Sequence, residues 1–196
     1  MKTKQTIAVI GATGNMGSAI SNSLSKANNR MLLFDTDIEK VKVLAKGIKA
    51  NPSVDVEALE YPTNTSWEAD VIILAVPHQA EKEIAGKIKE VANQKIVISI
   101  TNPLNETYNG LVTSPDTSAA EELQKLLPNS KVVKAFNTTF AADFSTPVID
   151  GTQVDAFVAG NDGDALQTVS DLVATAGFNP IVAGELSVSR TLENMQ

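Results

Sequence analysis

The sequence predicts an α/β fold: a doubly wound, mainly parallel sheet with helices on both faces. Three observations support this prediction. Short apolar runs alternate with helical patterns to the end of the chain, the first run enters a glycine-rich turn, and the second run ends in an acidic residue, Asp35. Nothing resembling a linker, a repeat or a low-complexity segment interrupts the alternation, so we expect one domain over residues 1–196.

The turn after the first apolar run is the clearest candidate site. Residues 6–10 read as a strand, and Gly11, Gly14 and Gly17 follow at the start of a helix beginning near Asn15. Gly11 permits the bend, Gly14 lets a pyrophosphate approach the backbone, and Gly17 lets the helix lie close to the sheet. This pattern predicts an NAD(P)-binding Rossmann fold with dinucleotide phosphates at the helix N-terminus. The plainer alternative is a structural glycine turn.

The first half of the chain completes the strand and helix alternation. The first helix has Ala19, Ile20 and Leu24 on one face, and residues 31–34 form the second strand. A capping box from Thr36 to Glu39 predicts the start of the next helix. Strands are then expected over residues 54–59, which alternate in polarity, and over residues 70–76, which are continuously apolar as in a buried parallel strand. A helix follows Pro77 and reaches Val91.

The second half repeats the pattern around one long polar loop. Residues 95–100 form a strand and residues 101–117 a loop of a length that is often functional. Ser118 and Glu121 cap a helix that runs through Leu127. The remaining expected elements are strands over residues 131–135, 154–159 and 181–183, and a helix from about Ala165 that ends at Gly177.

Composition narrows the range of partners. The net charge of −7 disfavours nucleic acid and anionic lipid, and no apolar stretch is long enough to span a membrane, so we expect a cytoplasmic protein. The chain has no cysteine and a single histidine, His78, so thiolate chemistry is excluded and no metal site is expected. A small-molecule electron acceptor and a second copy of the chain, as a homodimer, are the expected partners.

Ligands of such sheets bind over the carboxyl ends of the strands, where the strand order reverses. Candidate site residues are therefore those that follow the strands: Gly11, Thr13, Gly14, Asn15, Met16, Asp35, Ala75, Val76, Pro77, His78, Asn102, Pro103, Ala135 and Asn137.

Asp35 gives the most specific prediction, which concerns the adenosine ribose and the choice between NAD and NADP. A carboxylate at the end of the second strand can accept hydrogen bonds from the adenosine ribose, and it would repel the 2′-phosphate of NADP. Of the two cofactors, NAD is therefore slightly favoured over NADP. The alternative is a solvated turn residue, or an acidic partner for the dipole of the following helix.

Three polar side chains near the strand ends allow two interpretations each. His78 either contacts the nicotinamide or a substrate, or is a polar surface residue at a helix start. Asn102 and Asn137 either bind a carboxamide or ribose, or are turn residues that tolerate unusual backbone angles. The sequence leaves both questions open.

Several motifs together resemble a known family. They are Ile-Gly-Ala-Thr-Gly-Asn-Met-Gly (10–17), Thr-Asn-Pro-Leu (101–104), Ser-Ala-Ala-Glu (118–121), Val-Val-Lys-Ala-Phe-Asn-Thr (132–138) and Leu-Ser-Val-Ser-Arg-Thr-Leu-Glu-Asn-Met (186–195). Their order is that of the deazaflavin (factor 420)-dependent NADP oxidoreductase family, which also includes the cytoplasmic reductase domains of membrane metalloreductases. The resemblance spans nearly the whole chain.

The resemblance implies hydride transfer between a nicotinamide dinucleotide and a deazaflavin or flavin ring lying against it. It places the pyrophosphate at Thr13, Gly14, Asn15 and Met16, the adenosine ribose at Asp35, Thr36 and Lys40, and the nicotinamide beside Ala135. Direct transfer between stacked rings needs no acid or base, so no catalytic residue is predicted.

The chain departs from the family pattern at three places. Members that prefer NADP have a small hydroxyl residue and an arginine where this chain has Asp35 and Thr36. Deazaflavin users have His-Thr where this chain has Asn137 and Thr138. Several members continue with a further helix, whereas this sequence ends at Gln196, so we expect a substrate site that is open, completed by a partner chain or absent.

Other functions remain as alternatives. A non-catalytic NAD(P)-binding module that senses redox state is compatible with the glycine turn, and the absence of an evident acid–base pair in the sequence favours it. A short-chain dehydrogenase needs a tyrosine followed four residues later by a lysine, and neither Tyr61 nor Tyr108 has one. An imine reductase of the pyrroline-carboxylate type shares the turn but normally adds a large helical domain, for which this sequence has no room.

Overall fold

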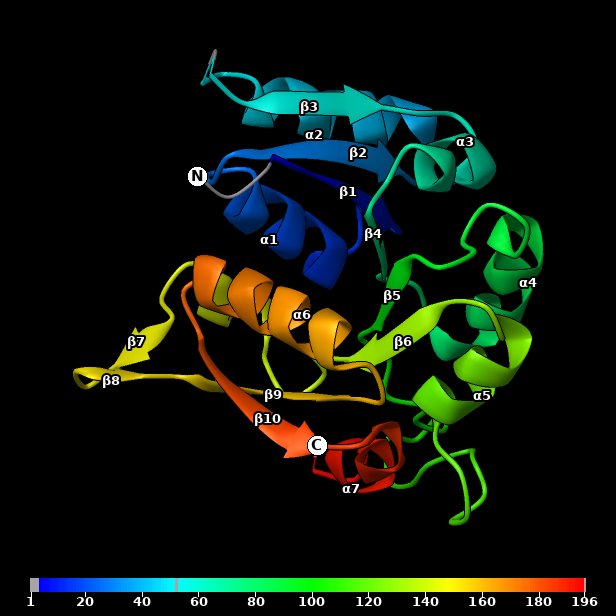
Figure 1. Ribbon diagram of the computed structural model, residues 1–196. Coiled ribbons are helices and arrows are strands. Elements are labelled where there is room, and N and C mark those ends of the chain that lie inside the picture. The colour runs from blue at the N-terminus through cyan, green and yellow to red at the C-terminus, as the bar shows by residue number, and fades with distance from the viewer. Residues whose placement is uncertain (1–3, 52, 196) are drawn as a thin grey trace.

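An eight-stranded sheet forms the centre of the computed structural model, which describes residues 4–51 and 53–195. The strand order is β10-β9-β6-β5-β4-β1-β2-β3, and all neighbours are parallel except β6 and β9. The strands are β1 (Gln5–Ile10), β2 (Asn29–Phe34), β3 (Asp55–Ala58), β4 (Val71–Leu74), β5 (Ile96–Ser99), β6 (Lys131–Lys134), β9 (Asp155–Gly160) and β10 (Asn179–Gly184). Strands β7 (Val148–Ile149) and β8 (Thr152–Gln153) form a separate hairpin that projects from the body (Figure 1).

Helices cover both faces of the sheet, as predicted (Figure 1). Helices α1, α2 and α6 contribute to one hydrophobic core cluster, and α4 and α5 contribute to the other. The helices are α1 (Asn15–Leu24), α2 (Ile38–Ile48), α3 (Pro62–Trp67), α4 (His78–Ile88), α5 (Ala119–Leu126), α6 (Gly163–Thr175) and α7 (Ser189–Leu192), with 3₁₀ turns η1 (Ala141–Phe144) and η2 (Leu186–Val188). The predicted fold class is confirmed.

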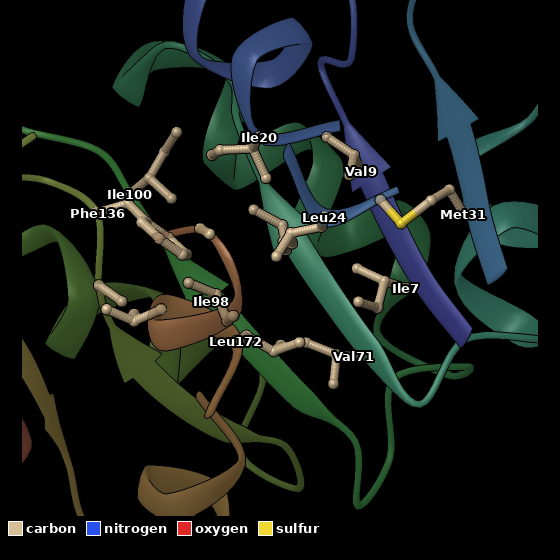
Figure 2. Close-up of a cluster of buried hydrophobic side chains, with 14 of the residues drawn as sticks. Ile7, Val9, Ile20, Leu24, Met31, Val71, Ile98, Ile100, Phe136 and Leu172 are labelled. Atoms are coloured by element: carbon tan, nitrogen blue, oxygen red, sulfur yellow. The ribbon is translucent and has the colours of Figure 1, made fainter. Parts of the chain in front are cut away.

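Successive side chains of the central strands point alternately into the two hydrophobic core clusters, one on each face of the sheet. In β1, Ile7 and Val9 belong to the cluster under α1, whereas Ala8 and Ile10 belong to the cluster under α4 and α5. Successive side chains of a strand point to opposite faces, so a strand that is apolar throughout must be covered on both sides. Figure 2 shows the first cluster, where Ile20 and Leu24 of α1 lie over the strand residues.

The strand order reverses between β1 and β4, and this positions the site. The chain runs outward through β2 and β3, then returns through α3 to place β4 on the other side of β1. The loops after β1 and β4 therefore turn in opposite directions and leave a crevice between them, where such sheets bind ligands.

The structure corrects several expected elements. Helix α2 begins after Asp37, whose side chain accepts a hydrogen bond from the Lys40 amide, so the cap is Asp37 and not Thr36. The last strand spans Asn179–Gly184, longer than the three residues expected. Helices α3 and α7 and the β7–β8 hairpin are too short to show a clear periodicity. The end of the sequence, Gln196, lies outside the described residues.

In the described part of the chain, no helix combines the length and apolar character needed to cross a membrane.

Candidate functional site

The glycine turn forms an open cradle at the N-terminus of α1. A Cβ on Gly11, which has φ +86°, would lie 2.3 Å from the carbonyl oxygen of Ala75, and a Cβ on Gly17 would lie 2.0 Å from that of Gly11. A Cβ on Gly14 would meet only the Gly11 oxygen, at 3.5 Å. Gly11 and Gly17 are thus required by packing, whereas Gly14 keeps the surface of the cradle open. No side chain caps α1 and its first turn holds no acidic residue, so its positive end suits an anion.

Asp35 at the end of β2 is bound to this turn. Its Oδ2 accepts hydrogen bonds from the Thr13 amide (3.0 Å) and hydroxyl (2.5 Å), and its Oδ1 accepts from the Thr36 amide at 2.7 Å. Partial burial tends to raise the pKa of the Asp35 carboxyl, but the hydrogen bonds from Thr13 and Thr36 outweigh it and lower the pKa. Asp35 is therefore a fixed negative charge beside the glycine turn.

Lys40 lies on a separate hollow between α1 and α2. This hollow has a volume of about 460 Å³ and is lined by Thr13, Ser18, Asp37, Glu39, Lys40, Val43 and Leu44. The Lys40 ammonium lies 3.1 Å from the Asp37 carboxylate. Of the predicted ribose residues, Lys40 lines this hollow and Asp35 and Thr36 do not, and the charged side chains that line the hollow are more acidic than basic.

Most of the other predicted residues meet in one cavity, which we call the central cavity. It has a volume of about 380 Å³ and lies at the β1/β4 crevice. It is lined by Gly14, Asn15, Met16, Ala75, Val76, Pro77, His78, Ile100, Thr101, Asn102, Leu104, Phe136, Asn137 and Thr139. The size falls within the usual range of small-molecule sites.

Besides Thr13, Asp35, Thr36 and Lys40, three further predicted residues do not line the central cavity. Gly11, Pro103 and Ala135 are buried behind its wall, and Ala135 is fully inaccessible. Their positions at strand ends are as expected, but in this structure they support the wall and do not form its surface.

The two asparagines hold each other across the cavity. Asn102 Nδ2 donates to the Asn137 carbonyl oxygen (2.8 Å), and Asn137 Nδ2 donates to Asn102 Oδ1 (3.0 Å) and to the Leu192 carbonyl oxygen (2.9 Å). Their amides therefore join the loops after β5 and β6 to the C-terminal segment, residues 189–195. This structural role differs from the direct ligand contact considered for them.

His78 is the titratable side chain of the central cavity. It starts α4, and its Nδ1 lies 3.0 Å from Oε2 of Glu81, one helical turn further on. The hydrogen bond to Glu81 raises the pKa of His78 and outweighs the opposing effect of partial burial. Glu81 itself is 3% exposed and its Oε1 lies 3.4 Å from the hydroxyl of Ser99. His78 is thus a strand-end residue with a defined acid–base partner.

A buried ion pair lies beneath this region. The Lys134 ammonium of β6 lies 2.7 Å from Oε1 of Glu193, and both side chains are fully inaccessible. Lys134 also donates to the Thr101 carbonyl oxygen. Burial lowers the pKa of Lys134, and the adjacent Glu193 carboxylate opposes that shift.

The sequence alone indicates no role for Lys134, Glu193 or Glu81. The available signals were weak: a lysine inside an otherwise buried strand, and a glutamate three positions after His78 on the same face of a helix. Phe136, which lines the cavity with φ +59°, is a further addition, because a bulky residue rarely adopts this conformation. Among the described residues, no group of three or more acidic or histidine side chains could hold a metal ion.

Comparisons with known proteins identify relatives over the whole chain. The family described as "NADP oxidoreductase coenzyme F420-dependent" matches residues 6–103. An F420-dependent NADP reductase of Methanocaldococcus jannaschii is 34% identical, and the match covers 95% of this chain and 87% of that protein. Metalloreductase STEAP3 of Rattus norvegicus is 29% identical, and the match covers 63% of this chain and 24% of that protein.

Solved structures agree on the fold. A protein from Arthrobacter sp. FB24 superimposes with a TM-score of 0.82 at 24% identity, over 96% of this chain and 88% of that one. A pyrroline-5-carboxylate reductase from Coxiella burnetii superimposes with a TM-score of 0.60 at 16% identity, over 92% of this chain and 60% of that one.

Proposed function

The chain belongs to the family of coenzyme F420-dependent NADP oxidoreductases, and on that premise we propose that it transfers a hydride between a nicotinamide dinucleotide and a deazaflavin such as F420. Family membership makes it an NAD(P)-dependent oxidoreductase. We propose three further features of this activity: the acceptor ring, the residues of the site, and the choice between NADH and NADPH.

One observation carries the proposal. The open glycine cradle and the central cavity are continuous, because Gly14, Asn15 and Met16 line the same cavity as His78, Phe136 and Asn137. A dinucleotide whose phosphates lie on the N-terminus of α1 would extend its nicotinamide into this cavity. Such a cavity can hold a second ring against the first.

The chain's own residues would bind and orient the two rings. Backbone amides of Gly14, Asn15 and Met16 would hold the phosphates, and the wall formed by Val76 and Ile100 would exclude water from the nicotinamide side. When bound, the nicotinamide supplies the hydride. Fixed positioning of two stacked rings accounts for much of the rate enhancement in such a reaction.

Asp35 bears on the choice of dinucleotide. Relatives are named for NADP, yet here the carboxylate of Asp35 is fixed beside the turn and the Lys40 ammonium is paired with Asp37. A 2′-phosphate would meet this negative charge, whereas the 2′-hydroxyl of NADH would not. We therefore propose that NADH binds at least as tightly as NADPH.

The test is a calorimetric titration with NADH and with NADPH at one salt concentration, followed by stopped-flow reduction of F420 and of a flavin. We expect bleaching of F420 and an NADH Kd no higher than the NADPH Kd. No transfer from either dinucleotide to either ring would contradict the proposed reaction. NADPH binding about tenfold more tightly, a difference of about 1.4 kcal/mol, would contradict the role of Asp35 alone.

The non-catalytic redox sensor is now the weaker alternative. It drew support from the lack of an evident acid–base pair in the sequence, and the structure pairs His78, which lines the cavity, with the buried Glu81 behind it. Turnover with any acceptor would exclude it.

A further inference from the structure

The geometry points to a proton donor in the central cavity: we propose that His78 is a catalytic residue that delivers a proton from Nε2 to the acceptor ring, and that Glu81 is its positioning residue. This inference rests on the proposed function and names a residue that acts in the reaction.

The pairing of His78 with Glu81 fixes which nitrogen is available. Nδ1 lies 3.0 Å from Oε2 of Glu81. Because a carboxylate oxygen accepts hydrogen bonds, Nδ1 carries a proton and donates it to Glu81. Nε2 is then the ring nitrogen that is available to a ligand in the central cavity, which His78 lines. The His78 side chain is 20% exposed, compared with 4% for Glu81, so the histidine can reach a ligand and the glutamate cannot.

Glu81 is held by groups from two neighbouring strands. Its Oε1 lies 3.4 Å from Ser99 Oγ on β5, and its charge interacts with the Lys134 ammonium on β6. An opposite charge in this buried setting compensates the loss of hydration of a carboxylate. The carboxyl is therefore fixed in place, and it fixes the imidazole in turn.

The charges around His78 favour the protonated ring. Glu81 of α4 has the largest effect, and Glu122 of α5 and Glu193 add to it. The Lys134 ammonium pairs with Glu193 and interacts electrostatically with Glu81, and the groove between α4 and α5 that His78 also lines carries Lys82 and Lys125. On balance the pKa of His78 is raised, because the hydrogen bond to Glu81 and the nearby carboxylates outweigh the effect of partial burial.

A proton is required by the balance of the reaction. NAD(P)H, the acceptor and one proton give NAD(P)⁺ and the reduced acceptor, because the hydride brings two electrons to the ring without the second proton. In our proposal that proton leaves His78 Nε2, and solvent reprotonates the neutral imidazole afterwards. The rate should therefore fall as the pH rises through the pKa of His78, where the donor form is lost.

The first test uses the fact that His78 is the only histidine of the chain. In protein without a histidine tag, the imidazole gives a single NMR signal, which is followed from about pH 5 to about pH 9. We expect a midpoint above the ordinary value, and a lower midpoint in Glu81→Gln. In the matched control Glu83→Gln, an exposed residue of α4 paired with Lys87, the midpoint should not move. If the His78 titration midpoint in Glu81→Gln equals that of the unmodified protein, the positioning role of Glu81 would be overturned.

The second test measures hydride transfer to F420 as a function of pH. His78→Gln should lower kcat about 100-fold and remove the fall at high pH, with the dinucleotide Kd unchanged within about threefold. Glu81→Gln should move that fall to lower pH, and Glu83→Gln should match the unmodified protein.

The outcomes separate the two proposals. Unmodified protein that transfers hydride, with His78→Gln equally active at every pH, would overturn the role of His78 and leave the proposed function intact. Unmodified protein that binds dinucleotide but transfers no hydride to F420 or flavin would overturn the proposed function, and the proton-donor role with it. Should Glu81→Gln fail to fold, the partly exposed His78→Gln still decides the matter.

Discussion

At the scale of single residues, the three glycines of the first turn, Gly11, Gly14 and Gly17, are the same residue type but have different roles. Gly11 and Gly17 face backbone atoms at distances that no side chain could tolerate. Gly14 has φ −66° and ψ 167°, which any residue can adopt, and the space above it is open. Packing therefore explains the first two glycines, whereas Gly14, the N-cap of α1, leaves open space in which a ligand could lie.

We expect Gly14→Ala to separate binding from stability. The change in unfolding free energy should stay within about 1 kcal/mol, because a gain from lower chain entropy opposes a slightly poorer helix cap. The added methyl would occupy the cradle, so the Kd for NADH and NADPH should rise tenfold or more, as measured by calorimetry.

Gly17→Ala is the matched comparison. Its Cβ would lie 2.0 Å from the Gly11 carbonyl oxygen, so α1 would have to shift and urea denaturation should show a marked loss of stability. Equal effects of the two substitutions on both stability and binding would show that Gly14 is also a packing residue.

At the scale of elements, the C-terminal segment is attached to the site by polar groups. Glu193 accepts hydrogen bonds from the amides of Ala119 and Ala120 at the start of α5 and pairs with Lys134. It thereby caps α5, binds β6 and holds residues 189–195 beside the central cavity. A buried ion pair of this kind contributes more to specifying the arrangement than to net stability.

The pair Lys134 and Glu193 should show strong coupling. We expect Lys134→Met and Glu193→Gln each to cost about 3–5 kcal/mol, because each leaves a buried partner uncompensated. The double substitution should cost clearly less than the sum, which urea denaturation of all four proteins measures.

An exposed pair provides the control for this cycle. Lys42 lies 2.8 Å from Glu39 on α2 with both side chains more than half exposed, and its replacement by Met should cost less than about 1 kcal/mol. Costs at Lys134 and Glu193 that add to within about 0.5 kcal/mol would show that the two charges are held independently.

At the scale of the whole molecule, one sheet connects the first strand to the last. Strands β9 and β10 extend the parallel part through an antiparallel contact with β6, and α6 packs in the same core cluster as α1. We propose, as the sequence predicts, that residues 1–196 behave as one domain. The dinucleotide site should then stabilise the whole chain, although its residues come from the first three quarters of the sequence.

We expect one cooperative thermal transition whose midpoint rises on binding. At a ligand concentration of about 100 Kd the gain is about 2.7 kcal/mol, or roughly 5–10 °C in Tm for a chain of this size. Scanning calorimetry with NADH and with NADPH measures the shift. Two separated transitions, only one of which moves with ligand, would contradict a single domain.

Local sequence patterns are sufficient for the layout of the fold, and they place the candidate site at the strand ends around the crevice. Continuous apolar runs such as residues 71–74 predict buried parallel strands, and the glycine turn places the cradle at the end of the first. The sequence does not reveal the short elements. It also leaves the start of α2 ambiguous, because Asp37 and Thr36 are both good caps and only the folded backbone distinguishes them.

The sequence by itself determined the fold class, the family and the group of loops that meets at the crevice, because these depend on periodicity and on residues adjacent in the chain. Only the tertiary structure decided which side chains act together. The structure pairs residues from different elements or turns: Glu81 with His78, Lys134 with Glu193, and Asn102 with Asn137. A buried charge is tolerated only where an oppositely charged or hydrogen-bonding partner lies beside it. For Lys134 with Glu193 and for Asn102 with Asn137, which are far apart in the sequence, the pairing is a property of three-dimensional packing that no local pattern records.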